Sequence, residues 1–195
     1  MKLILGSSSP RRKEILGFFS FPFDQKSPDF DEESVLFQND PAQYAIDVAV
    51  GKARALQRQF PNSPILSADT VVYRNGKLFQ KPKSLKEAEE MLLELSKGEQ
   101  EVYTGVAVLY QDKLWTDVEM STVEFCDVTL PQIQAYVKTL RPLDKSGSYT
   151  VQGLGGLIVK RVSGCYYNIV GLPIQTVRRC LLHVGIDLWD SFKQA

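Results

Sequence analysis

The chain of 195 residues is long enough for one domain, or two closely joined lobes, with a sizeable core. Its 23 basic and 23 acidic side chains cancel, which argues against a protein that coats nucleic acid or binds an acidic membrane surface. No stretch approaches the ~18 apolar residues of a membrane span, and the apolar run at the N-terminus is too short for a signal peptide, so a cytoplasmic protein is expected.

The beginning of the chain alternates strands with a helix. Residues 2–5 are predicted to form a short buried strand. Ser9 followed by Pro10 predicts the start of a helix, because Ser is a favoured cap and Pro a favoured first helical residue. A second strand is expected at 21–26, and an acidic loop at 29–33 follows it.

The starts of the later helices are predicted from their capping residues. Capping boxes, in which a cap side chain and the third helical residue each bind a backbone N–H, predict helices that begin at Asp40, Ser84 and Thr129. Gly98 should end the second of these, and Pro173 should open the last helix of the chain.

Several hairpins are predicted between these helices. The pair Asn75 and Gly76 is typical of a type I′ turn. The expected strands are 65–68, 71–74, 77–79, 102–110, 114–125, 157–162 and 165–170. Frequent hairpins among alternating helices favour an α/β class with a mixed, α+β-like sheet, folded as a single domain over residues 1–195, with two lobes around a cleft as a variant.

The supply of cysteine and histidine limits the chemistry. Cys126, Cys165 and Cys180 are widely spaced and odd in number, so buried free thiols are expected rather than disulfides or a zinc site. His183 is the only histidine and lies in an apolar helical stretch, where a structural role is expected. A Ser-His-Asp or Cys-His mechanism is therefore disfavoured, because the one histidine is expected to be structural. Acid–base or metal chemistry must come from carboxylates and lysines.

The segment 6–12, with the sequence GSSSPRR, could bind an anion. A strand leads into a loop of small residues that opens a helix, and free backbone N–H groups at a helix start attract phosphate. Arg11 and Arg12 add forked, permanently charged donors. The alternative is a plain serine cap with two solvated arginines, since neither a Walker loop nor a GxGxxG loop is matched.

Carboxylates supply a second candidate group. Asp69 follows an apolar strand, a common place for a metal ligand or general base, although a turn aspartate bonding its own backbone is the alternative. Asp31, Glu32 and their neighbours form an acidic loop that is either solvated or folded over Asp69. In the second case, oxygen ligands without histidines favour Mg²⁺ or Mn²⁺.

Isolated lysines and a glycine-rich segment complete the inventory. Taken singly, Lys52, Lys81 and Lys145 are typical surface lysines. Residues 149–156 combine three glycines with Gln152, which suits either a loop that approaches a ligand closely or a plain turn before a strand. An anion loop, carboxylates, lysines and no nucleophile pair together suggest metal-assisted attack of water on a phosphoanhydride.

These segments resemble the Maf family in their order and spacing. The matching motifs are Ser-x-Ser-Pro-Arg-Arg at 7–12, Ala-Asp-Thr-Val-Val at 68–72, Lys-Pro at 81–82, Asp-Lys-x-Gly-x-Tyr-x-x-Gln-Gly at 144–153 and Val-Gly-Leu-Pro at 170–173. The resemblance runs from about residue 3 to residue 180. Any one segment is a weak signal, but the ordered set is specific.

The resemblance implies an elongated mixed α/β fold with a deep cleft, like that of inosine triphosphate pyrophosphatases. It implies an enzyme that hydrolyses a nucleoside triphosphate to the monophosphate and pyrophosphate with a divalent metal, Mg²⁺ or Mn²⁺, and it suggests a homodimer. The sequence departs mildly from the family at Gly6, at 146–148 and at Thr150, and the last of these leaves fine specificity open.

Catalytic roles follow from the same resemblance. Asp69 is expected to accept the proton of the attacking water and to bind the metal together with Glu32, for which Asp31 is a close alternative. Lys52 and Lys81 are expected to complete the catalytic group by contacting the phosphates.

Substrate-binding roles are implied for six further positions. The expected residues are Ser7, Arg11, Arg12, Thr70, Lys145 and Gln152. Arg11, Thr70 and Gln152 resemble the subgroup that acts on dTTP and UTP, with modified pyrimidine nucleotides as further candidates, whereas Arg12 is expected to hold phosphate. The alternatives are a pyrophosphatase for 7-methyl-GTP or another purine triphosphate, and a nucleotide-binding regulator of septum formation without catalysis.

Overall fold

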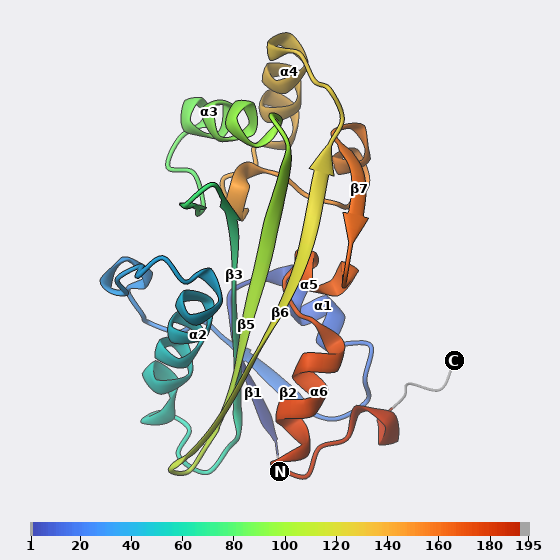
Figure 1. Cartoon of the computed structure of the whole chain (residues 1–195). Helices are drawn as coiled ribbons and strands as arrows, with labels where there is room; N and C mark the ends of the chain where they lie inside the picture. Colours follow the sequence, from blue (N-terminus) through green and yellow to red (C-terminus); the bar gives the residue numbers. More distant parts are fainter. Residues whose placement is uncertain (1, 192–195) are drawn as a thin grey trace. The chain divides into compact units, whose positions relative to one another are not determined.

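The computed structural model describes residues 2–191 and has a mixed α/β fold (Figure 1). Seven strands pair in the order β2-β1-β3-β5-β6-β7, with β4 added on β3. The strands are β1 (Leu3–Gly6), β2 (Phe23–Lys26), β3 (Ile65–Arg74), β4 (Lys77–Phe79), β5 (Glu99–Tyr110), β6 (Lys113–Phe125) and β7 (Val159–Ser163). The helices are α1 (Pro10–Leu16), α2 (Pro41–Gln57), α3 (Leu85–Leu95), α4 (Leu130–Leu140), α5 (Tyr166–Val170) and α6 (Ile174–Leu182).

The chain forms two compact units. Unit 1 contains the described residues up to Asp69, Thr104–Glu119 and the described residues from Gly171 onward, and unit 2 contains Thr70–Tyr103 and Met120–Val170. Strands β3, β5 and β6 each contribute one part to either unit. That both units belong to one domain around a cleft stays a prediction. None of the helices within residues 2–191 is long and apolar enough to cross a bilayer.

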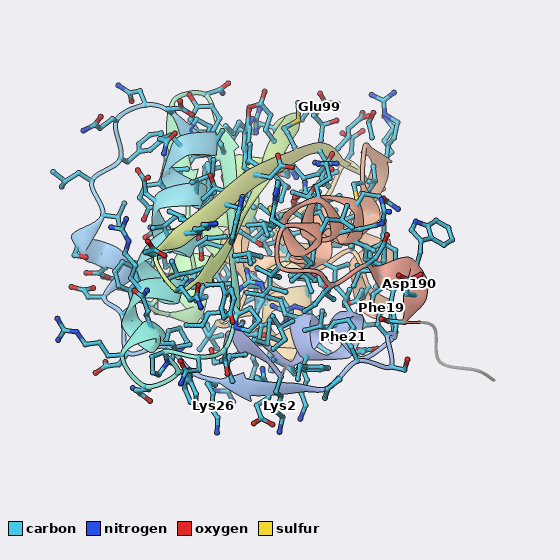
Figure 2. All side chains as sticks on the ribbon, turned by 90° about the horizontal axis from the view of Figure 1, so that it is seen from below. Lys2, Phe19, Phe21, Lys26, Glu99 and Asp190 are labelled. Atoms are coloured by element: carbon cyan, nitrogen blue, oxygen red, sulfur yellow. The ribbon has the colours of Figure 1, made fainter. Side chains whose placement is uncertain are left out.

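Unit 1 is built on parallel strands. β1 pairs in parallel with β2 on one side and with β3 on the other. Parallel neighbours need crossover connections, which α1 and α2 provide. α2 and α6 lie on opposite sides of these strands in both views (Figures 1 and 2). β2 forms the edge of the sheet, and its last residue, Lys26, points outward, where a charged side chain discourages pairing with another chain (Figure 2).

Unit 2 is built on antiparallel pairs. β3 turns into β4 through Asn75 and Gly76, both with positive φ (48° and 83°), as the predicted type I′ turn requires. β6 pairs antiparallel with β7. Helices α3 and α4 pack over a hydrophobic core that includes Phe79, Leu92 and Ile133.

The predicted helix starts are confirmed, with a capping box at Thr129, whereas the side chains of Gln43 and Glu87 bind Asp47 and the Lys83 N–H in place of their cap residues. Asp40 Oδ1 accepts hydrogen bonds from the second and third helical N–H groups of α2, both at 3.0 Å. Ser84 Oγ accepts from the Glu87 N–H at 3.1 Å. The backbone N–H of Thr129 donates to the side chain of Gln132 at 2.8 Å.

Two strand predictions were wrong. Residues 165–170 do not form a strand but contain the short helix α5, because the helix lets buried Asn168 donate to the Val102 carbonyl and to Ser121 Oγ, both at 2.9 Å. A short apolar run fits either structure from its periodicity alone. Asp69 does not follow a strand but lies inside one, since β3 continues through it to Arg74.

The free thiols and the histidine were predicted with partial success. All three cysteines are free, but only Cys180 is buried, and its burial raises the pKa of the thiol to about 12. Cys126 and Cys165 are half-buried. His183 ends α6 and stacks on Trp115 with a centroid separation of 5.3 Å, which agrees with a structural role.

Candidate active site

The loop after β1 holds one arginine between two partners. Ser7 is buried, and its Oγ accepts hydrogen bonds from the Ser9 backbone N–H (3.1 Å) and from Arg12 Nη1 (3.3 Å). Ser9 caps α1 by accepting from the Arg12 backbone N–H at 3.4 Å. Arg12 Nε also donates to the carbonyl of Gly171 at 2.7 Å. The predicted turn into a helix is therefore present, with Arg11 half-buried beside it.

Three elements of unit 1 bring two carboxylates to one lysine. Lys52 of α2 places its Nζ 2.6 Å from Asp69 Oδ1 of β3 and 2.8 Å from Glu32 Oε1, in the 3-10 turn Glu32–Ser34. The side chains of Lys52 and Asp69 are only 7% and 9% exposed, whereas that of Glu32 is 37% exposed. Scarce water strengthens charge attraction, so the ammonium holds the buried Asp69 carboxylate firmly, whereas the Glu32 carboxylate stays in contact with solvent. We call these three residues the buried cluster.

The position of Lys52 follows from the way α2 packs on β3. Ser67 Oγ donates to the Ala49 carbonyl at 2.6 Å in the protein interior. Residues two apart in a strand share a face, so Asp69 points to the same side as Ser67. Residues three apart in a helix are neighbours on its surface, so Lys52 lies one turn beyond Ala49. This hydrogen bond therefore fixes the register in which Lys52 meets Asp69.

Arg12 brings a second positive charge to the carboxylates. Burial lowers the pKa of its guanidinium, the negative charges of Asp69 and Glu32 act in the opposite direction, and Arg11 reinforces the lowering. Two carboxylates thus face two basic side chains, Lys52 and Arg12. An anionic substrate would therefore meet a site whose positive groups are already held in position.

Other predicted substrate-binding residues lie on adjoining loops of unit 2. Ser146 Oγ donates to the Thr70 carbonyl at 2.8 Å, and the backbone N–H of the next residue donates to the Gln80 carbonyl at 3.2 Å. Lys81 and Lys145 are the chain neighbours of Gln80 and Ser146. The two lysines therefore belong to loops that are hydrogen-bonded to each other, and one of these loops is also hydrogen-bonded to Thr70.

Gln152 lies on the following segment of unit 2. Its side chain is exposed, and its backbone N–H donates to Thr150 Oγ1 at 3.1 Å, just before the 3-10 turn Gly153–Leu157. Thr70 and Gln152 both belong to unit 2, as do the two predicted lysines. That they meet the buried cluster of unit 1 stays a prediction.

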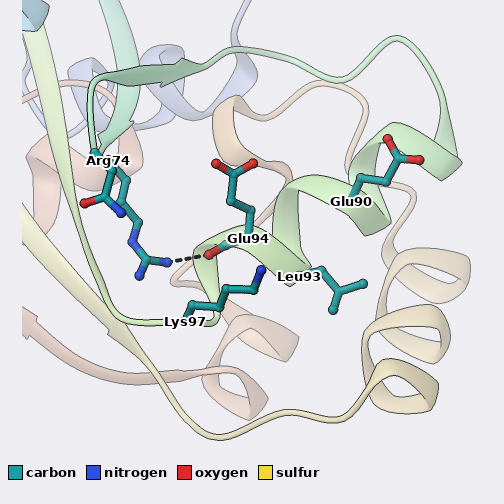
Figure 3. Close-up of a pocket in the computed structure, with 6 residues that line it drawn as sticks. Arg74, Glu90, Leu93, Glu94 and Lys97 are labelled. Atoms are coloured by element: carbon teal, nitrogen blue, oxygen red, sulfur yellow. Dashed lines mark hydrogen bonds between the residues drawn. The ribbon is translucent and has the colours of Figure 1, made fainter.

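A hollow in unit 2 also gathers charged side chains (Figure 3). Its volume is about 560 Å³, and its lining residues are Arg74, Asn75, Glu90, Leu93, Glu94 and Lys97. Arg74 Nη1 donates to the backbone carbonyls of Glu94 and, at 3.2 Å, of Leu95. These carbonyls lie in the last turn of α3, where the Lys97 N–H also donates to the Glu94 carbonyl at 3.3 Å, so Arg74 adds to the cap of this helix.

Comparison with known proteins identifies the family. A model of the family described as Maf-like protein matches residues 2–184. The chain belongs to the Maf family. A Chlamydia caviae protein named dTTP/UTP pyrophosphatase is 48% identical over 190 residues, covering 97% of each chain. A Chlamydia muridarum protein named nucleoside triphosphate pyrophosphatase is 42% identical with the same coverage.

Two further matches to this Maf-family chain are less similar to it. A Clostridium perfringens protein, also named dTTP/UTP pyrophosphatase, is 39% identical and covers 96% of this chain and 100% of its own. Among solved structures, the Staphylococcus aureus Ham1 protein matches with 13% identity and a TM-score of 0.45, covering 65% of this chain and 73% of its own. That score is too low to carry an argument.

The donors of the buried cluster fit a divalent metal. Within residues 2–191 no group of three or more His, Cys, Asp or Glu side chains could hold an ion by itself. Mg²⁺, however, commonly takes one or two carboxylates and completes its shell with water and substrate phosphates. Asp69 and Glu32 converge on one cation, the Lys52 ammonium, and that they also share a divalent metal stays a prediction.

Sequence reasoning overlooked residues that support the cluster in this Maf-family chain. Ser67 sets the register of α2, and its signal was its place two residues before Asp69 in the same strand. Gly51 stands in the middle of α2 directly before Lys52, and an added Cβ there would lie 2.2 Å from Cζ of Phe30. A glycine inside a predicted helix was the available signal for this second contact.

Proposed function

We propose that this Maf-family protein hydrolyses dTTP and UTP to the nucleoside monophosphate and pyrophosphate, with modified pyrimidine triphosphates as further substrates. The observation that carries the proposal is the buried cluster, in which one ammonium holds two carboxylates beside a braced arginine. The names of the relatives supply the reaction and the nucleotides. A homodimer is part of the proposal and rests on the family resemblance, whereas the proposed cytoplasmic location rests on the short apolar run at the N-terminus and the free thiols.

In the proposed mechanism Asp69 accepts the proton of the attacking water. A phosphorus–oxygen bond forms to this water while the phosphoanhydride bond breaks, and pyrophosphate leaves with the electron pair. Lys52 keeps the Asp69 carboxylate oriented toward the reacting water through its 2.6 Å contact. Arg12, braced by Ser7 and the Gly171 carbonyl, presents a fixed positive charge to the phosphates.

A divalent cation would be held by Asp69 and Glu32, with phosphate oxygens and water as its other ligands. When bound, it supplies Lewis-acid stabilisation of the negative charge that develops on the phosphates. Glu32 is well suited to exchange partners, because its side chain is 37% exposed while the other two members of the cluster are buried.

Selection of the base is assigned to Arg11, Thr70 and Gln152, and the phosphates are assigned to Lys81 and Lys145 with Ser7. In unit 2 the bond from Ser146 to the Thr70 carbonyl supports this assignment, since it fastens a lysine-bearing loop to the residue that follows Asp69. The rival proposal is a purine-directed enzyme, for 7-methyl-GTP or inosine triphosphate.

A substrate panel tests the proposal. The purified protein is given dTTP, UTP, CTP, 7-methyl-GTP and inosine triphosphate with Mn²⁺, Mg²⁺ or EDTA, and both pyrophosphate and orthophosphate are measured. We expect one pyrophosphate per dTTP or UTP consumed, no orthophosphate and no turnover in EDTA. Preference for a purine would overturn the assignment of the base. Orthophosphate as the first product would overturn the mechanism, and tight dTTP binding without turnover in any metal would favour the regulator.

A further inference from the structure

An aromatic ring rests on the glycine that precedes Lys52. A Cβ added to Gly51 would lie 2.2 Å from Cζ of Phe30, 2.4 Å from Cε2 and 2.8 Å from Cε1. Real side chains do not approach so closely, so the edge of the ring occupies space that only glycine leaves open. Glycine is among the least favourable residues inside a helix, so its presence in the middle of α2 calls for a compensating contact.

Phe30 belongs to the loop that carries Glu32, and the two residues are joined by a stiff turn. Asp31 Oδ1 accepts a hydrogen bond from the Glu33 backbone N–H at 3.0 Å. Ser34 Oγ donates back to the Asp31 carbonyl at 2.6 Å. These bonds order the turn that directly follows Phe30 and carries Glu32, so we expect displacement of the ring to shift the Glu32 carboxylate.

The same stretch of α2 meets this loop twice. The ring of Phe30 packs against Gly51, and the next residue, Lys52, forms an ion pair with the Glu32 carboxylate at 2.8 Å. A second aromatic contact anchors the loop farther along, where Phe37 packs edge-on against Tyr44 at a centroid distance of 5.9 Å. The first contact adjoins the buried cluster, whereas the second lies two helical turns before it.

We propose that Phe30 and Gly51 are a positioning pair, which holds the Glu32 carboxylate against Lys52 in the orientation that the hydrolysis of nucleoside triphosphates requires. The inference rests on the proposed function for its kinetic consequence. Neither residue is catalytic, because both act through Glu32. Phe30 is only half-buried, so its ring serves the loop more than the hydrophobic core.

The test substitutes the glycine. Alanine is the most favourable helix residue, so Gly51→Ala should leave the helix content and the melting temperature close to those of the wild type. The methyl group must expel the ring, and Glu32 should lose its position. We expect kcat for pyrophosphate release from dTTP to fall by about 10- to 100-fold, with KM changed by less than about threefold, because small misplacements near reacting groups are costly.

Epistasis distinguishes positioning from general damage. In a Glu32→Gln background, Gly51→Ala should cause no further loss of kcat, because the Glu32 carboxylate through which Gly51 acts is already absent. Phe30→Ala should resemble Gly51→Ala, and the double variant should be no worse than either. Phe37→Ala is the matched control, because it also removes a ring between the loop and α2, and it should keep kcat within about twofold of the wild type.

Two results would overturn the positioning role. One is an unchanged kcat in both Gly51→Ala and Phe30→Ala, and the other is an equal loss of kcat with and without the Glu32 carboxylate. If the wild type hydrolyses no nucleotide, the proposed function fails by itself. The positioning is then measured by urea unfolding, where the effects of Phe30→Ala and Glu32→Gln should be non-additive, and additivity would refute it.

Discussion

Lys52 in unit 1 and Arg74 in unit 2 are both cations held by two oxygen acceptors, but the acceptors differ in kind. Lys52 is buried between two carboxylates, whereas Arg74 binds two backbone carbonyls at the end of α3 (Figure 3). Carbonyls at a helix end must be satisfied in any folded state, so Arg74 has a structural partner. An ammonium and a carboxylate that lose water on burial carry a desolvation cost that a helix cap does not.

This difference shows why charge alone does not identify a site. The hollow of unit 2 contains basic and acidic side chains. Glu94 forms an ion pair there, with its Oε2 2.6 Å from Lys77 Nζ. The charges of the hollow lie near the surface, where ion pairs contribute little. The buried cluster combines scarce water, short contacts and three separate chain segments, which are the conditions for precise placement of a reacting group.

Removing the buried ammonium should lower both activity and stability, and its effect on kcat should be second only to loss of the Asp69 carboxylate. In Lys52→Met, Asp69 and Glu32 face each other without their shared partner, so kcat for pyrophosphate release should fall by about 10²- to 10³-fold. The free energy of unfolding should fall by about 3 kcal/mol, because a buried carboxylate loses its counter-charge. The fall in kcat is measured by pyrophosphate release, and the fall in the free energy of unfolding by urea unfolding. Lys52→Arg is the control that keeps the charge, and a Lys52→Met variant within threefold of wild-type activity would refute the role.

A smaller and purely structural effect is expected in the hollow of unit 2. Arg74→Met removes a cap from α3 and should cost about 1–2 kcal/mol of unfolding free energy while kcat stays within about twofold. Urea unfolding and pyrophosphate release on the same preparation provide the comparison. Lys97→Ala is the matched control in the same hollow and should change stability by less than about 0.5 kcal/mol. A large loss of kcat in Arg74→Met would erase the distinction between the two regions.

Local signals in the sequence were sufficient for most of the fold. Asp40, Ser84 and Thr129 begin helices as predicted, because a cap needs only residues three positions apart. The turn at Asn75 was equally local. The stretch around Asn168 was predicted as a strand, and it is helical because a buried amide finds partners on other strands, which no local pattern records.

The candidate site was predictable in its residue types but not in its assembly. The family resemblance pointed to Asp69, Glu32 and Lys52, yet taken singly Lys52 had the pattern of a surface lysine. Its burial depends on the bond from Ser67 to α2, and the approach of Glu32 depends on a loop that packs on Gly51. Such long-range contacts arise from packing, so the sequence indicates them only indirectly, through a strand serine and a glycine inside a helix.

The most direct test of the buried cluster is the rate of pyrophosphate release from dTTP by Asp69→Asn, measured beside the wild type with saturating Mn²⁺. Asparagine keeps the shape of the side chain, and Lys52 keeps Glu32 as a partner at 2.8 Å, so the variant should remain folded. It lacks the carboxylate that accepts the proton, and we expect kcat to fall by about 10³-fold or more. A folded Asp69→Asn variant that releases pyrophosphate at the wild-type rate would contradict the assignment of this cluster as the hydrolytic centre.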